Sequence, residues 1–355
     1  MGRPFVSVLI DTYNHERFIE AAVLSVLEQD FPESHREIIV VDDGSTDRTP
    51  EILHKFEPQV RLLRKANGGQ ASAFNAAIPE CRGEIIAFLD GDDCWARGKL
   101  TKVAGVLSND PQCGVVGHGI VNAFEGETEA VDAPQHLERL RIDSVSSARV
   151  FRLRKSYLGT SRMTLRRNIA VKICPVPEAL VIEADEYIFT LASALSYVVI
   201  LPEALTYYRQ HGQNLYNSAG GNIQGLRRKQ EVMAALAQAL RREMPALDVP
   251  TDAVECVCEI VQVEAQQLRL MLDGGAPWET VRTESAIYRI MHGDAAQGHR
   301  AFRAISMIPA VLLPPKWFYA VRRWLGTKTW YRAARRRVLP VPEITHIEIR
   351  EESIR

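Results

Sequence analysis

The densest group of chemically useful side chains in this sequence is Asp90–Asp93, where three carboxylates fall within four residues. An apolar run of strand type comes directly before it, so the carboxylates follow a strand end. Carboxylates this close repel one another, and a bound cation relieves that repulsion. Mg²⁺ and Mn²⁺ take oxygen ligands and commonly bridge protein carboxylates to substrate phosphates. The segment therefore predicts a divalent-cation site, with a solvated acidic turn as the alternative.

A second group, Asp42–Asp47, also follows a strand-type run and begins with two aspartates. A carboxylate at Asp42 or Asp43 can accept the ring N–H of a base such as uracil. Gly44 lets the chain turn tightly toward a ligand. A helix-capping turn is the alternative, because the three polar residues after Gly44 would satisfy a cap. A cap alone does not explain the paired aspartates.

The elements that must position these groups are strands alternating with helices. Buried strands are predicted by short apolar runs rich in β-branched residues at 6–10, 38–41, 60–63, 85–89 and 115–120. The segment 18–28 carries an apolar stripe at helical spacing. The alternation predicts an α/β fold with a mostly parallel, doubly wound sheet. Such sheets bind ligands beyond the carboxyl ends of their strands, and three polar segments fall there: Asp11–Asn14, Asp42–Asp47 and Asp90–Asp93.

The later part of the chain changes character. Residues 122–147 are acidic and loop-like, and structure resumes with a predicted helix at Tyr187–Ser196 and a strand at Tyr197–Leu201. Residues 222–305 predict two or three antiparallel helices, separated by the breaks at Pro245–Pro250 and Gly274–Pro277.

The composition sets broad limits on the class of protein. The 355 residues are 46% hydrophobic and 25% charged, with a net charge of -1. This suffices for one large α/β domain with a smaller appendage, and it argues against a protein that coats nucleic acid. The six cysteines form no C-x-x-C pair, which predicts reduced thiols in a cytosolic protein. We expect neither a signal peptide nor a run of roughly 18 apolar residues that would span a bilayer.

In this context the sequence resembles the inverting, DXD-type glycosyltransferases of family 2, which have the GT-A fold. The resemblance covers roughly residues 4–215. It rests on motifs that stand in the family's order: V-S-V-L-I-D-T-Y-N (6–14), I-I-V-V-D-D-G-S-T-D (38–47), N-G-G-Q-A-S-A-F-N (67–75), G-E-I-I-A-F-L-D-G-D-D (83–93), A-D-E-Y-I-F-T-L-A (184–192) and Y-Y-R-Q-H-G-Q-N (207–214).

The resemblance implies roles for individual residues. Those that would bind the nucleotide are Thr12, Tyr13 and Asn14 at the base and ribose, Asp43 reading the base with Asp42 in support, and Asn67, Gln70 and Asn75 bordering the site. Those that would lie at the metal are Asp92 as principal ligand, Asp90 near the metal or the ribose, and His211 near the metal and diphosphate. Asp185 aligns with the catalytic base of inverting members, and Glu183 and Glu186 are neighbouring alternatives. A helix cap at Asp185 and an ordinary surface histidine at His211 remain alternatives.

The sequence departs from the family pattern at two positions. Asp11 stands where members usually have Pro, which leaves the shape of that loop open. Phe74 stands where many have Arg, so a cationic contact to phosphate would come from elsewhere, such as Lys65 or Arg209. Gly159 belongs either to a loop that faces the acceptor or to a simple turn.

Residues 316–337 hold eight Lys or Arg and no Asp or Glu, with aromatic residues interleaved. Aromatic residues favour the membrane interface, and each basic residue near an anionic leaflet contributes about 1 kcal/mol. The segment predicts a peripheral membrane anchor. The alternative is a basic face packed against the acidic catalytic domain or a partner chain. RNA binding has no supporting motif, and no nucleic-acid partner is expected.

Together these patterns predict an α/β protein with the GT-A nucleotide-diphospho-sugar transferase fold, built on a doubly wound mixed sheet, with a C-terminal helical region. The expected divisions are a catalytic domain at 1–215, a helical region at 216–308 and a basic aromatic segment at 309–355. Within the catalytic domain the nucleotide-sugar half is expected at about 1–120 and the acceptor half at about 121–215.

The expected activity is transfer of a hexose-type sugar from a nucleotide diphosphate, UDP favoured, to an acceptor hydroxyl with inversion. The expected cofactor is Mg²⁺ or Mn²⁺, and the acceptor a carbohydrate or lipid-linked molecule in surface polysaccharide or glycolipid synthesis. The expected location is cytoplasmic or peripheral on the inner face of the cytoplasmic membrane. One rival is a sugar-nucleotide nucleotidyltransferase, but residues 11–17 lack the glycine-rich phosphate loop it needs. The other is an inactive nucleotide-sugar binding module, against which Asp92, Asp185 and His211 argue together.

Overall fold

The apolar runs of the N-terminal part form the strands of one sheet in the computed structural model, which describes residues 3–124, 130–211, 223–292 and 307–326. The strands are β1 (Val6–Thr12), β2 (Arg36–Asp42), β3 (Arg61–Arg64), β4 (Ile85–Asp90), β5 (Cys94–Trp95), β6 (Cys113–Phe124), β7 (Ala130–Asp132), β8 (Glu138–Leu140), β9 (Thr164–Arg166) and β10 (Tyr197–Gln210). β1, β2, β3, β4 and β6 confirm the strands predicted in the first 120 residues.

The sheet is mixed, with the strand order β3-β2-β1-β4-β9-β6-β10-β5 and with β7 on β6 and β8 on β10. Strands β3, β2, β1 and β4 form a parallel block. The short strand β9 runs antiparallel between β4 and β6, and β6 pairs parallel with β10. The carboxyl ends of β1, β2 and β4 therefore meet at one edge of the sheet.

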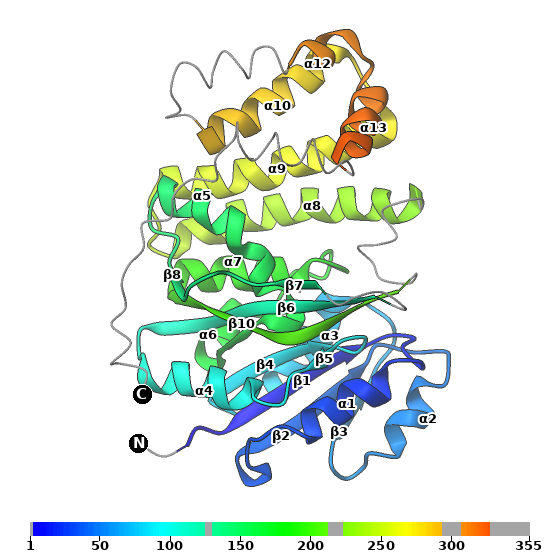
Figure 1. The fold of residues 1–355 in the computed structure, drawn as a ribbon, viewed down its shortest axis with the longest axis vertical. Coiled ribbons are helices and arrows are strands. Elements are labelled where there is room, and N and C mark those ends of the chain that lie inside the picture. The colour runs from blue at the N-terminus through cyan, green and yellow to red at the C-terminus, as the bar shows by residue number, and fades with distance from the viewer. Residues whose placement is uncertain (1–2, 125–129, 212–222, 293–306, 327–355) are drawn as a thin grey trace.

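Helices cover both faces of the sheet (Figure 1). Side chains that alternate along the strands point to opposite faces, so Leu9 and Phe88 join one core cluster whereas Ile10 and Leu89 join the other. The first cluster includes residues of α3 (Gln70–Ala77), α5 (Val145–Arg154), α6 (Arg167–Ile173) and α7 (Ala184–Leu195). The second includes residues of α1 (Ile19–Leu27), α2 (Thr49–His54) and α4 (Lys99–Asn109).

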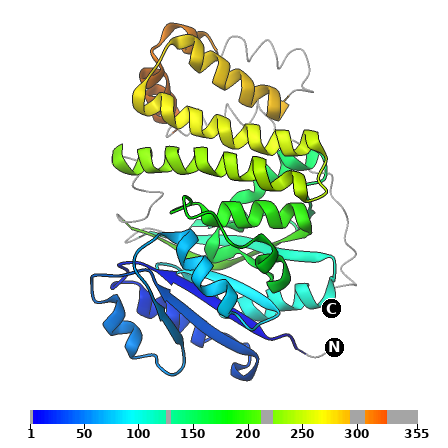
Figure 2. The ribbon, with the colours of Figure 1, turned by 180° about the vertical axis from the view of Figure 1, so that it is seen from behind.

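A helical layer lies beyond α7 in both views (Figures 1 and 2). It comprises α8 (Ile223–Glu243), α9 (Thr251–Asp273), α10 (Pro277–His292), α12 (Ile308–Leu312) and α13 (Pro315–Gly326). Buried residues such as Leu236 of α8 and Val257 of α9 belong to the same core cluster as α5 and α7. The helices predicted between 222 and 305 thus form, as far as that range is described, and they share a core with the sheet. Among the described residues, none of the helices has the length and apolar character needed to cross a bilayer.

The structure corrects the prediction in three places. The segment expected to be loop-like contains the end of β6, the short strands β7 and β8, and the start of α5. β10 continues to Gln210 instead of ending at Leu201, and its ladder with β6 shifts register between Leu201 and Ala204, where Pro202 has no N–H to donate. Helix α7 begins at Ala184, three residues before the predicted start, so Asp185 lies in its first turn.

Candidate active site

An acidic cluster occupies the sheet edge where β1 and β4 end. Asp11 and Asp90 are cross-strand neighbours in the parallel pair, and the turn after β4 adds Asp92 and Asp93. Carboxylate oxygens of Asp90, Asp92 and Asp93 all lie within 4.8 Å of one another. The strand ends therefore bring four carboxylates to one place, as the sequence predicted for the segment after β4.

The carboxylates of this cluster, one buried and three half-buried, lie close enough together to repel one another. Burial, and then repulsion from neighbouring aspartates, raises the pKa of Asp11 and of Asp90 well above the ordinary value. The same two causes raise the pKa of Asp93 to about 7. One carboxylate oxygen of Asp11 is buried and has no hydrogen-bond partner in the described part of the chain. Hard oxygen donors that repel one another fit a divalent cation, which would relieve this repulsion.

Two histidines flank Asp92. The Nε2 atom of His211 lies 3.2 Å from Asp92 Oδ2, and that of His15 lies 4.0 Å from the same oxygen. Burial acts to raise the pKa of Asp92, but the hydrogen bond from His211 and the nearby His15 hold that pKa below its ordinary value. His15 Nδ1 also lies 3.1 Å from Thr12 Oγ1. Asp92 is thus the member of the cluster whose surroundings favour its ionised form, which suits a metal ligand.

An aromatic ring packs against the imidazole of His211. The ring of Phe18 stacks on the imidazole with centroids 4.2 Å apart. Arg209 was predicted as a candidate phosphate contact, but its guanidinium donates to the carbonyls of Asp92 and Phe18. We therefore assign Arg209 to bracing the acidic turn. His15 was not predicted as a site residue, although it directly follows the T-Y-N motif.

The second polar segment, Asp42–Asp47 at the end of β2, contacts the loop that contains Gly68 and Gly69. Asp43 is almost fully buried, and its carboxylate accepts hydrogen bonds from Gly68 N–H (3.1 Å), Gly69 N–H (2.7 Å) and the Lys65 ammonium (2.6 Å). Gly44 has φ +79°, and a Cβ there would lie 2.7 Å from the backbone nitrogen of Asn67. Asp43 therefore holds the predicted nucleotide-binding loop in position, and Lys65 pairs with it.

The neighbouring β1 loop is shaped by Asn14, which has φ +56°. Its side-chain oxygen accepts the N–H of Thr46, and its own N–H donates to Ser45 Oγ. Asp42 is buried beneath and accepts the N–H of Ser45. Tyr13 beside it is exposed, with its side chain at the surface of this loop. The structure thus joins the Asp11–Asn14 and Asp42–Asp47 segments into one rim.

The remaining residues predicted to border the nucleotide differ in position. Gln70 connects two segments, since it donates to Thr160 Oγ1 (3.0 Å) and accepts from Ala184 N–H (2.9 Å). Both polar atoms of the Asn75 side chain are bound to the backbone of Val176, at 2.7 Å each. Asn75 therefore braces the segment before α7, and Asn67 lies exposed on the loop that Asp43 holds.

Asp185 is buried in the first turn of α7 beside the acidic edge. Its carboxylate accepts hydrogen bonds from Thr160 N–H (3.0 Å), Thr160 Oγ1 (3.1 Å) and Glu186 N–H (2.8 Å). Burial, together with the charge of Glu183, raises the pKa of Asp185 above the ordinary value. The alternative bases are engaged in ion pairs, Glu183 with Lys229 and Glu186 with Lys155. This favours Asp185 as the base.

A short 3₁₀ helix, Thr160–Arg162, joins the two chemical centres. Thr160 binds Asp185, and the next residue, Ser161, donates from Oγ to Asp90 Oδ2 at 3.2 Å. The carbonyl of Ser161 accepts hydrogen bonds from Trp95 Nε1, Lys99 Nζ and Thr206 Oγ1. Thr160 and Ser161 were not predicted as site residues, because no motif or periodic pattern in the sequence marks them.

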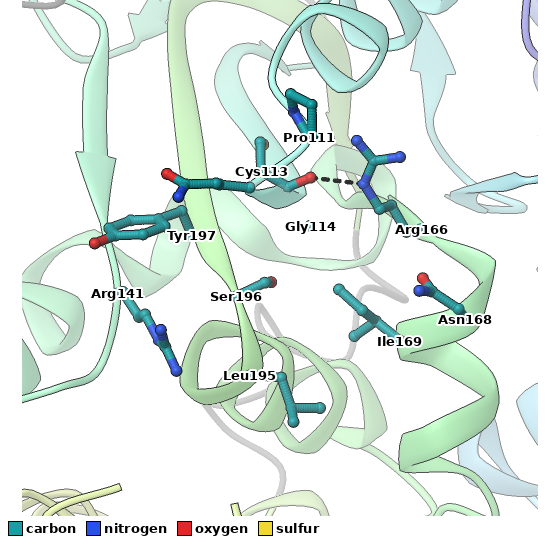
Figure 3. Close-up of a pocket in the computed structure, with 11 residues that line it drawn as sticks. Pro111, Cys113, Gly114, Arg141, Arg166, Asn168, Ile169, Leu195, Ser196 and Tyr197 are labelled. Atoms are coloured by element: carbon teal, nitrogen blue, oxygen red, sulfur yellow. Dashed lines mark hydrogen bonds between the residues drawn. The ribbon is translucent and has the colours of Figure 1, made fainter. Parts of the chain in front are cut away.

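A cavity of about 350 Å³ lies at the opposite edge of the sheet, where β6 and β10 begin (Figure 3). Arg141, Arg166 and Tyr197 line it, and none of the predicted site residues does. The Arg166 guanidinium donates to the backbone carbonyls of Cys113 and Asp110, so it ties β9 to the strand ends there. The cavity therefore stands apart from the acidic edge.

Three features lie together at one edge of the sheet: the acidic strand ends, the glycine loop held by Asp43, and the buried Asp185. This arrangement defines an enzyme of the GT-A architecture. Residues 7–174 match the profile of the family described as Glycosyl transferase family 2. An uncharacterized glycosyltransferase of the cyanobacterium Nostoc, alr2836, is 34% identical over 220 residues, which cover 60% of this chain and 67% of the relative. The chain belongs to glycosyltransferase family 2.

Other relatives are covered less completely. The Staphylococcus aureus poly(ribitol-phosphate) β-N-acetylglucosaminyltransferase TarS is 32% identical over 133 residues, which cover 34% of this chain and 23% of the relative. Among solved structures, S. aureus TarS superposes with a TM-score of 0.52 at 22% identity, over 75% of this chain and 43% of that one. The Pyrobaculum calidifontis mannosyltransferase PcManGT, in complex with GDP-Man and Mn²⁺, gives 0.51 at 21% identity, over 97% and 89%. These structures confirm the GT-A fold.

Proposed function

We propose that this protein is a metal-dependent, inverting glycosyltransferase that uses a nucleotide diphosphate sugar, UDP favoured, as its donor. The proposal rests mainly on the adjacent residues Thr160 and Ser161. Thr160 donates a hydrogen bond to Asp185 and Ser161 donates one to Asp90, so the two residues connect Asp185 to the Asp90–Asp93 cluster. A transferase needs two such centres, one for the departing diphosphate and one for the acceptor proton. Relatives named as an N-acetylglucosaminyltransferase and a mannosyltransferase support sugar transfer.

The donor would bind across the joined rim of the strand ends. Thr12, Tyr13 and Asn14 would contact the base and ribose, with Asp43 at the base edge. Asp90, Asp92 and His211 would hold Mg²⁺ or Mn²⁺ beside the diphosphate. When bound, the cation would neutralise the charge that develops on the departing nucleotide.

Asp185 would accept the proton of the acceptor hydroxyl as that oxygen forms its bond to the anomeric carbon. The bond between that carbon and the diphosphate oxygen breaks at the same time, on the opposite face of the sugar. Attack and departure on opposite faces invert the configuration. Burial raises the proton affinity of Asp185, which suits a general base better than an exposed carboxylate would.

The acceptor would be a carbohydrate or a lipid-linked sugar in surface polysaccharide or glycolipid synthesis. The enzyme would then act in the cytoplasm or on the inner face of the cytoplasmic membrane. These parts of the proposal rest on the family and on the relatives' names.

A donor panel tests the proposal. UDP-, GDP- and dTDP-sugars are screened by thermal unfolding with and without Mn²⁺, and the release of nucleoside diphosphate is then followed with candidate acceptors. A donor at one hundred times its Kd stabilises the fold by about 2.7 kcal/mol. Asp92→Asn should remove the part of this stabilisation that depends on Mn²⁺, whereas Glu20→Gln, an exposed acid of α1, should keep it. Stabilisation by no donor, or equal Mn²⁺ dependence in Asp92→Asn, would contradict the proposal.

A further inference from the structure

The helices α12 and α13 expose large apolar side chains at a density unlike the rest of the described surface. Six of the thirteen exposed large hydrophobic side chains lie between 308 and 324: Ile308, Val311, Leu312, Trp317, Val321 and Trp324. Leu312 is 72% exposed and Trp317 is 67% exposed. Scattered single apolar residues are normal on a protein surface, but a concentration of this kind marks an interaction site.

The spacing places these side chains on one face of each helix. In α13, Trp317, Val321 and Trp324 stand at i, i+4 and i+7. In α12, Ile308, Val311 and Leu312 stand at i, i+3 and i+4. Residues at these intervals share a helix face, so each helix presents an apolar stripe to solvent.

The opposite faces of the same helices fix them to the protein. Phe318 and Tyr319 of α13 are buried in a cluster that also holds Leu270 of α9. Arg322 pairs with the buried Glu284 of α10 at 2.6 Å. The outward stripes are therefore presented by anchored helices.

The charge around the stripes has one sign. Between residues 308 and 326 there is no Asp or Glu, and Lys316 and Arg323 are exposed at either side of the α13 stripe. The sequence from 327 to 337 adds further Lys and Arg, again without an acid. Tryptophan at the edges of an apolar stripe with flanking cations is the pattern of an interfacial helix on anionic lipid.

A second copy of the chain fits this surface poorly. A twofold dimer places the same patch of each subunit against the other, so it would bring basic residues face to face. An anionic bilayer supplies both an apolar layer for the stripes and negative headgroups for the cations.

The apolar stripes of α12 and α13 also lie on the same side of the molecule as the candidate active site. In Figures 1 and 2, α12 and α13 lie on the side toward which β1, β6 and β10 run, the side that carries the acidic cluster. We propose that the outward stripes of α12 and α13 form a surface that docks on anionic lipid. That this docking brings the catalytic edge to a lipid-borne acceptor rests on the function proposed above, whereas the docking itself does not.

The test uses the full chain and vesicles of phosphatidylcholine alone or mixed with phosphatidylglycerol in equal parts. Flotation and tryptophan fluorescence measure binding at low and high salt. The wild type should bind the anionic vesicles, with a blue shift of its emission, and should bind phosphatidylcholine much more weakly. The double substitution Val321→Glu with Trp324→Glu should lower the partition coefficient at least about tenfold, or about 1.4 kcal/mol. Both side chains are exposed, so the unfolding temperature should hold.

The control is Val171→Glu, which places one glutamate on an exposed apolar position of α6 and should bind as the wild type does. Equal binding by the double variant and the wild type would overturn the proposal, because the basic residues beyond α13 would then suffice. A concentration-dependent dimer that the double variant abolishes, with vesicle binding unchanged, would overturn it as well. Asp92→Asn should bind vesicles normally, so loss of catalysis and loss of docking are measured separately.

Discussion

Replacing Asp185 with asparagine separates the two roles that this side chain can have, hydrogen-bond acceptor and proton acceptor. The carboxylate oxygens receive Thr160 N–H, Thr160 O–H and Glu186 N–H. An amide keeps one oxygen, so at least one of these donors would face an NH₂ group. An unsatisfied buried donor costs about 1–3 kcal/mol. Removing a negative charge near Glu183 offsets part of this cost.

The expected loss of unfolding free energy is therefore about 1–2 kcal/mol, well below the roughly 5–15 kcal/mol that holds a domain folded. The expected effect on the chemical step is much larger. A positioned general base contributes about 10²–10⁴ in rate, or about 3–5 kcal/mol of barrier. A folded protein with nearly normal donor affinity and a rate lowered by that factor is the predicted phenotype.

Three measurements on Asp185→Asn make the comparison: urea unfolding, donor affinity by thermal shift, and the transfer rate at saturating donor. Thr160→Val serves as the matched control, since it removes one donor to the same carboxylate and keeps the carboxylate itself. It should slow transfer less than about tenfold. A rate in Asp185→Asn within tenfold of the wild type, or donor affinity lost in proportion to the rate, would show that Asp185 is a structural residue of α7.

The pH dependence of the transfer rate is an independent test of Asp185 as the general base. A general base works in its ionised form, and burial together with Glu183 raises the pKa of Asp185. The rate should therefore rise with pH through a value above the ordinary range of an aspartate. In Asp185→Asn that rise should be absent.

Three further predictions concern other buried ionisable side chains. Asp43→Asn, which weakens the bonds holding the glycine loop, should cost about 2–4 kcal/mol in urea unfolding and should also weaken donor binding; unchanged stability would show that the loop does not depend on it. Lys155→Met should cost about 3–5 kcal/mol, because it leaves the buried carboxylate of Glu186 without its ion pair, and adding Glu186→Met should restore part of this loss; full additivity of the two substitutions would refute the pairing. Burial holds the pKa of His118 well below 6.5, so the unfolded chain binds a proton that the folded one does not, and acid should lower stability below that pH. His118→Phe should flatten this slope by about 1.4 kcal/mol per pH unit, measured by urea unfolding at several pH values, and an unchanged slope would contradict it.

The acidic edge could be predicted from the sequence because its causes are local. An apolar run followed by aspartates reads directly as a buried strand with a polar end, and parallel strands bring such ends together. That reasoning correctly places Asp11, Asp42 and Asp90 at neighbouring strand ends along one edge of the sheet. It also predicts the helices that cover the sheet, because their apolar stripes are periodic.

The residues that connect the site could not be found in this way. Thr160 and Ser161 stand in a short helix with no periodic pattern, and their partners Asp185 and Asp90 are 25 and 71 residues away in the sequence. Asn75 was placed at the nucleotide by its motif, but its amide is used by the backbone of Val176. A motif gives the residue type, whereas tertiary packing decides which partner its polar atoms meet.

The buried Lys99 shows how much of the site depends on such packing. Its ammonium is fully buried, lies 3.7 Å from the centre of the Trp95 ring and donates to the Ser161 carbonyl at 2.7 Å. Burial lowers the pKa of Lys99, so holding its charge there costs free energy that exposed residues do not cost. That cost makes sense if the position of Ser161 matters more than stability, because Ser161 and Thr160 together set the position of Asp90 relative to Asp185. Transfer of a sugar requires the leaving group and the acceptor proton to be handled at a fixed separation, and a displacement of about 1 Å can cost a hundredfold in rate. The spacing of the two proposed centres would therefore depend on Lys99, which lies outside both of them and holds the Ser161 carbonyl.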